Sequence, residues 1–174
     1  MKSALLITFL LHLQHACFVS GKCIKGDDYT STIMDEEALL TEEDLDTART
    51  YIMCPNSRVQ VQEYDYGKKD FTGNGTEALS IWNRNVRLQC GNGKIENNCR
   101  FVGGTYQIEI ISADQLFKDR EIVALTGIVI EGFQFVKAQE GNIFIYGAEV
   151  GKDDKIGADV KIINCKFAVS FFVR

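Results

Sequence analysis

Short runs of alternating hydrophobic and polar residues fill the chain from residue 49 onward. Residues 51–54, for example, read Tyr-Ile-Met-Cys, and residues 128–130 read Ile-Val-Ile. Runs of this length and period are typical of β-strands, and Gly, Asn and Asp separate them. The 174-residue sequence holds a single proline, which suits interior strands that donate all their amide protons. The pattern predicts an all-β body over residues 50–174, and a β-sandwich is the simplest alternative.

A repeated tetrapeptide favours a solenoid over that sandwich. Each copy has a turn residue, an apolar residue, a polar residue and then Phe, at residues 98–101, 132–135 and 164–167. The first positions are 34 and then 32 residues apart. A near-constant period that contains strands and no helix is typical of stacked parallel coils. We therefore predict a parallel β-solenoid of about four coils.

The solenoid predicts where the repeat residues point. Gly132 and Asn164 are expected at corners, because Gly and Asn accept a left-handed backbone. Phenylalanine is expected inside each coil and the polar residue outside it. The inward column is Phe101, Phe135 and Phe167, and the outward column is Arg100, Gln134 and Lys166.

Residues 22–49 form an acidic segment with nine acids against three bases. Thr41 precedes three acidic residues, a pattern that resembles a helix N-cap. Leu39, Leu40 and Leu45 form its apolar stripe. We predict one or two helical turns over residues 35–47 that cap the first coil. A docking site for a basic partner is the less favoured alternative.

The first 21 residues have the pattern of a secretory signal peptide. Lys2 precedes an apolar run over residues 4–13, and Gly21 supplies a small residue at the expected cleavage point. The run is too short for a membrane span, and no later stretch is long and apolar enough for one. We expect a secreted protein. His12 and His15, the two histidines of the chain, leave with the signal. This excludes histidine-based triads and histidine-ligated zinc, while the net charge of -5 disfavours a nucleic-acid binder.

Export makes disulfides the expected use of cysteine. Cleavage removes Cys17 and leaves five cysteines, so at least one has no partner within the chain. Cys90 and Cys99 enclose a loop of eight residues and form the favoured pair, and Cys23 with Cys54 is the second. Cys165 lies two coils from Cys99 and is the predicted free, buried thiol.

The cysteines include no CxxC pair, and the acidic residues form no ladder on one outward face. The sequence therefore predicts no metal site and no cofactor. Asn74-Gly75-Thr76 is the one N-glycosylation sequon. It lies in a glycine-rich turn that we expect to be exposed. Asn74 is therefore the candidate glycosylation site, and an unused sequon is an equal alternative.

Several of these elements together resemble a known group. They are residues 49–56 (Arg-Thr-Tyr-Ile-Met-Cys-Pro-Asn), Leu88-Gln89-Cys90-Gly91, Asn97-Asn98-Cys99 and Gly103-Gly104. Over about residues 35–174 the chain resembles secreted right-handed parallel β-helix proteins of diatoms and related algae, which are similar in fold to the pectin-lyase-like superfamily. The resemblance implies a right-handed helix. Members of this group are often longer, which implies that the chain is a shortened form.

The enzymes of that superfamily are hydrolases and lyases, and both use clustered acidic side chains to cleave polyuronates. Asp153-Asp154 is the one paired Asp within a repeat, and a solvated turn explains it better. Tyr64, Tyr66 and Trp82 are candidates for stacking on sugar rings, although a single Trp is more often part of the core. We therefore expect a non-catalytic protein of the extracellular matrix or cell wall with extracellular polysaccharide as its partner. A polysaccharide lyase or hydrolase is one alternative. A protein that self-associates through its C-terminal end, near Phe171 and Phe172, is the other.

Overall fold

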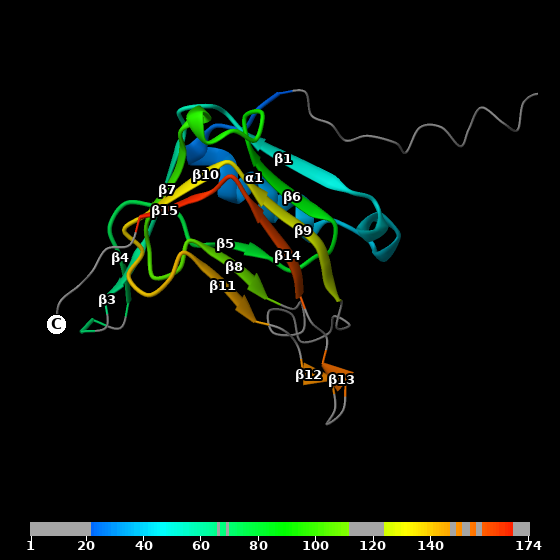
Figure 1. Cartoon of the computed structure of the whole chain (residues 1–174). Coiled ribbons are helices and arrows are strands. Elements are labelled where there is room, and N and C mark those ends of the chain that lie inside the picture. The colour runs from blue at the N-terminus through cyan, green and yellow to red at the C-terminus, as the bar shows by residue number, and fades with distance from the viewer. Residues whose placement is uncertain are drawn as a thin grey trace, which may run out of the picture.

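The computed structural model describes residues 22–65, 67–68, 70–111, 124–146, 149–150, 154–155 and 158–168. The predicted signal peptide lies outside the described residues. Strands dominate the described residues, which also contain one α-helix (Figure 1). The predicted all-β class is confirmed, and the large sheets are parallel.

Three parallel sheets hold most of the strands, and the chain visits them in turn. The first sheet has the order β1 (Arg49–Met53), β6 (Val86–Cys90), β9 (Leu125–Glu131) and β14 (Ala158–Ile163). The second contains, in spatial order, β2 (Arg58–Val61), β7 (Cys99–Gly103), β10 (Phe133–Val136) and β15 (Lys166–Ala168). The third contains β5 (Leu79–Ile81), β8 (Ile108–Ile111) and β11 (Ile143–Tyr146). Each return to a sheet adds a strand beside the previous one, as Figure 1 shows.

Two antiparallel hairpins interrupt this order. The first pairs β3 (Glu63–Asp65) with β4 (Asp70–Thr72) and lies between β2 and β5 in the chain. The second pairs β12 (Glu149–Val150) with β13 (Asp154–Lys155), between β11 and β14. Both are insertions into the regular order of sheets.

The predicted phenylalanine column is confirmed. Phe101 pairs in register with Phe135, and Phe135 pairs with Phe167. Their rings stack with centroids 5.6 Å and 5.1 Å apart. Phe101 and Phe135 are fully buried, whereas Phe167 is 41% exposed. The column is therefore covered in its middle and open at β15.

The corners of the repeat also follow the prediction. Gly132 has φ +79° and Asn164 has φ +52°. A Cβ atom on Gly132 would lie 2.8 Å from the backbone carbon of Gly93, so both the conformation and the space require glycine. Asn98 precedes β7 and adopts the same left-handed conformation with φ +56°. Asparagine tolerates it better than most residues with a side chain.

The helix predicted over residues 35–47 is wrong in its bounds. The α-helix α1 spans Gly26–Ala38, and a 3-10 helix η1 spans Glu42–Asp46. The apolar residues that bury α1 are Tyr29 and Ile33. Of the predicted leucine stripe, Leu45 in η1 is buried, whereas Leu39 is 83% exposed. Thr41 is the N-cap of η1, where its backbone N–H donates to Asp44 Oδ2 at 3.0 Å.

Helix α1 packs against β1, β2 and β5, the first strand of each sheet. Tyr29 is fully buried and its ring lies 6.3 Å from Phe101 and 6.1 Å from Phe133. A Cβ on Gly26 would lie 2.1 Å from the Arg58 carbonyl oxygen, so glycine permits the close contact with β2. The helix therefore covers the end of the core that β1, β2 and β5 form.

Candidate functional site

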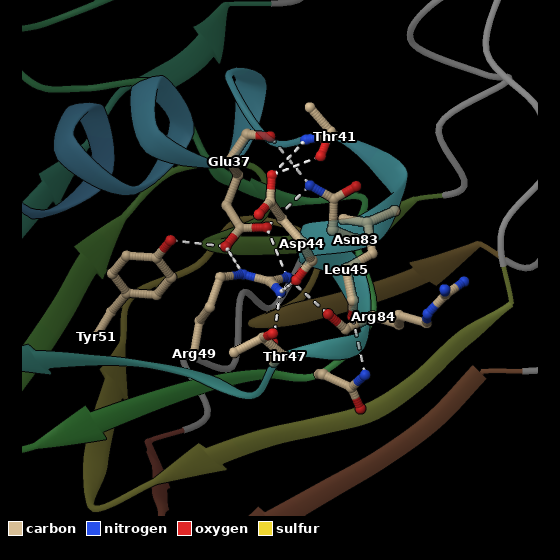
Figure 2. Close-up of polar contacts among 10 residues, drawn as sticks. Glu37, Thr41, Asp44, Leu45, Thr47, Arg49, Tyr51, Asn83 and Arg84 are labelled. Atoms are coloured by element: carbon tan, nitrogen blue, oxygen red, sulfur yellow. Dashed lines mark hydrogen bonds and ion pairs between the residues drawn. The ribbon is translucent and has the colours of Figure 1, made fainter. Parts of the chain in front are cut away.

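A buried polar cluster joins α1 to the first sheet (Figure 2). Arg49 and Glu37 form a bidentate ion pair, with Nε to Oε1 at 2.8 Å and Nη2 to Oε2 at 3.1 Å. The Tyr51 hydroxyl donates to Glu37 Oε1 at 2.7 Å, and Asn83 Nδ2 donates to Oε2 at 2.9 Å. Glu37 is 1% exposed and Arg49 is 8% exposed. Burial raises the pKa of Tyr51 far above its usual value, and its hydrogen bond to Glu37 adds to this.

The remaining donors of Arg49 go to backbone carbonyls. Nη1 donates to the oxygens of Asp44 and Thr47 at 3.1 Å and 2.7 Å, and Nη2 donates to Arg84 at 2.7 Å. All five N–H groups of the guanidinium are used, and Glu37 accepts three partners. The guanidinium has no donor left for a ligand, and each oxygen of the Glu37 carboxylate already accepts two hydrogen bonds. It fastens α1, η1 and the loop before β6 to β1, and we assign it a structural role.

The cysteines lie as the sequence analysis expects, with one difference. Cys23 bonds Cys54 and Cys90 bonds Cys99, with S–S distances of 2.00 Å and 2.03 Å. Cys165 is the one cysteine outside a disulfide within the described residues. It is half-buried rather than buried, because it lies at the open end beside β15. Burial raises the pKa of its thiol, which leaves it a poor nucleophile at neutral pH.

The other candidate residues separate into core and surface. Trp82 is 3% exposed and belongs to the core. Asn74 is exposed in the turn after β4, where a glycan has room. Tyr66 and Asp153 lie outside the described residues, and only the backbone of Asp154 is described. Tyr64 is the one proposed sugar-stacking residue that the structure places on a concave surface.

That surface is a groove of about 350 Å³ on the third sheet, beside the β3–β4 hairpin. Its residues come from the end of β2, the hairpin, the strands β5 and β8, and the connections that precede these two strands. They are Val61, Gln62, Tyr64, Phe71, Glu77, Ala78, Ser80, Thr105, Tyr106 and Glu109. We name this surface the hairpin groove.

Aromatic rings border the hairpin groove on two sides. Tyr64 and Phe71 meet edge to face at 5.3 Å in the hairpin, and Phe71 is 53% exposed. On the sheet side, Tyr106 stacks on Phe144 with centroids 4.7 Å apart, and Phe144 stacks on Tyr146 at 6.3 Å. Exposed rings of this kind offer flat apolar surfaces beside polar groups.

Carboxylates provide the charged groups of the hairpin groove. Glu109 stands beside Ser80 in the register of β5 and β8 and is half-buried. Burial raises the pKa of Glu109, the negative charge of Glu77 raises it further, and a hydrogen bond with Ser80 opposes the change. No Lys or Arg is among the lining residues. The groove therefore presents hydrogen-bond acceptors and negative charge, with no compensating cation in its wall.

The raised pKa of Glu109 predicts a pH-dependent stability. Because the folded chain holds this proton more tightly than the unfolded chain, stability falls as pH rises above the ordinary value of 4.5. Glu109→Gln should therefore be more stable than the parent at pH 7 and equal to it below about pH 4. Denaturant unfolding across this range measures the difference, with the exposed Glu96→Gln as control. A gap that stays constant with pH would contradict the assignment.

Other classes of site find no support in the described part of the chain. No group of three or more His, Cys, Asp or Glu side chains lies close enough to hold a metal ion there. Among the helices of that part, none has the length and apolar character needed to cross a membrane. No family model, curated protein or solved structure matches the chain.

Proposed function

We propose that the chain is a secreted, non-catalytic protein of the extracellular matrix or cell wall that binds an uncharged polysaccharide in the hairpin groove. The observation that carries the proposal is the groove itself, where the exposed ring of Phe71 and the half-buried rings of Tyr64 and Tyr106 lie beside carboxylate, amide and hydroxyl groups. Sugar rings offer apolar faces for such rings and hydroxyl donors for such acceptors. A chain of uronates would meet Glu77 and Glu109 with like charge.

The fold we propose for this function is a right-handed parallel β-helix of the diatom and pectin-lyase-like type. Three parallel sheets that the chain visits in turn, with phenylalanines in register between successive visits, support a helical path. The right hand is supported by the strong chirality of parallel crossover connections. Secretion rests on the signal-peptide pattern of residues 1–21, and N-terminal sequencing of protein from the culture medium tests it.

Phe71→Ala tests the binding site with little risk to the fold, because this side chain is 53% exposed. Loss of the ring should weaken binding of an uncharged polysaccharide by about three- to tenfold. Titration calorimetry against soluble glucan, mannan and xylan measures this. Leu39→Ala is the matched control, since Leu39 is an exposed apolar residue at the end of α1. A parent protein that binds none of these polymers would overturn the proposal.

Hydrolysis of the bound polysaccharide is the second candidate, and one observation favours it. Glu77 and Glu109 both line the groove, and a general acid needs a raised pKa, which is the direction found for Glu109. An assay for reducing ends released from a bound glucan separates the two functions. Steady release above the rate without protein favours hydrolysis, and binding with no release favours the matrix role.

A further inference from the structure

We infer that the outer face of the second sheet is a separate binding site for an anionic polysaccharide. A basic ladder runs across this sheet, with one polar residue from each strand. Arg58 pairs in register with Arg100, Arg100 with Gln134, and Gln134 with Lys166. The sequence analysis predicted three of these positions as an outward column, and Arg100 and Lys166 are exposed. Neighbouring strands place adjacent members about 4.8 Å apart.

The surroundings of the basic ladder leave its charge uncompensated within the sheet. The strands β2, β7, β10 and β15 contain no Asp or Glu. Next to the ladder runs a second in-register column of neutral residues, which are Gln60, Val102, Val136 and Ala168. The ion pairs of the described residues use Arg49, Lys68, Arg84 and Arg87, none of which belongs to the ladder. The basic ladder therefore crosses all four strands of the second sheet.

Two hydrogen bonds orient the arginines of the basic ladder. Arg100 Nε donates to Asn98 Oδ1 at 2.8 Å, and Arg58 donates to the side chain of Gln60. Gln134 Nε2 also donates to Asn98 Oδ1, at 3.2 Å. These contacts are with neutral acceptors, so the positive charge of each guanidinium remains available to an anion. Arginine is well suited to bidentate contacts with carboxylate or sulfate groups.

The ligand that fits is a linear polymer with regularly spaced negative groups. The basic ladder extends over four neighbouring strands, which suits a polymer chain that lies across the strands better than a compact ion. The whole protein carries a net charge of -5. The net charge would therefore repel a polyanion, and binding must come from the local positive charge of the basic ladder. This site differs from the hairpin groove, which lies mainly on the third sheet, includes only Val61 of the second sheet, and has two carboxylates and no basic residue in its lining.

Binding of dextran sulfate and of alginate at low salt tests the inference, with uncharged dextran as the reference polymer. Arg100→Gln combined with Lys166→Gln should weaken polyanion binding by about tenfold or more and flatten its salt dependence. The matched control is Lys94→Gln with Lys161→Gln, which removes the same charge from exposed residues outside the second sheet. The control should stay within about twofold of the parent.

Three outcomes would overturn this assignment. These are a parent that binds neither polyanion, a control pair that loses as much affinity as the ladder pair, and duplex DNA that binds as tightly as both polysaccharides. The last two would reduce the effect to nonspecific attraction of any polyanion to exposed basic residues. The Arg100→Gln, Lys166→Gln variant should still bind an uncharged polysaccharide as the parent does, so failure of the ladder and failure of the groove are distinguishable.

Discussion

Arg49→Met is expected to lower the free energy of unfolding by about 3–5 kcal/mol, because removal of one partner leaves a buried charge without its counter-ion. Glu37 is 1% exposed and would keep only Tyr51 and Asn83 as hydrogen-bond partners for its carboxylate. The substitution also releases the three backbone carbonyls that Arg49 contacts. Urea denaturation at pH 7 measures the loss.

Arg84→Met is the matched control for this prediction. Arg84 pairs with Asp46 at 2.7 Å, but the Asp46 side chain is 78% exposed, so this pair should contribute about 1 kcal/mol or less. Glu37→Leu combined with Arg49→Met should recover part of the loss, since no charge then remains buried. A single Arg49 variant as stable as the Arg84 variant would show that the cluster does not fasten α1 to the sheet.

The regular part of this fold was predictable because its signals are local in sequence. Strand periodicity places Phe101 and Phe135 on the inner face, and a turn residue three positions before each phenylalanine marks the corner. Each copy of the repeat carries both signals within four residues. The phenylalanine column and the left-handed corners at Gly132 and Asn164 followed from this pattern alone.

The helix bounds were missed because the stripe that decides them is short and mixed. The buried side of α1 includes Tyr29, Ile33 and Glu37. From sequence alone, an acidic residue at the end of such a stripe is predicted to face solvent. Only its partners explain its burial, and these lie 12 and 46 residues away at Arg49 and Asn83. Sequence spacing carries no signal for contacts between such distant, non-repeating positions.

The hairpin groove was only partly predictable for a related reason. Tyr64 was predicted for sugar stacking but Phe71 and Tyr106 were not, because the groove arises where an insertion folds against the third sheet. Tyr106 reaches it from the connection before β8, and Glu109 from β8 itself. The path of an insertion depends on tertiary contacts, whereas the outward positions Arg100, Gln134 and Lys166 repeat with the strands and were predicted from the sequence.

Phe135→Ala should cost about 3–5 kcal/mol of stability, whereas Phe167→Ala should cost about 1 kcal/mol or less. Both rings belong to one stacked column, and both substitutions remove the same atoms. Phe135 is fully buried between Phe101 and Phe167, while Phe167 is 41% exposed. The difference between the two therefore reports how far the core is covered at β15. Denaturant unfolding at several protein concentrations measures it.

The comparison also tests the self-association that an open sheet edge invites. If Phe167 is as exposed in solution as in the structure, its loss stays small at every concentration. A cost for Phe167→Ala that approaches that of Phe135→Ala, and that grows with protein concentration, would mean that a second copy covers β14 and β15. Ile162, which is 45% exposed on β14, would then lie in the same interface. In that case the open end is an assembly surface, and the two proposed polysaccharide sites would be repeated along the assembly.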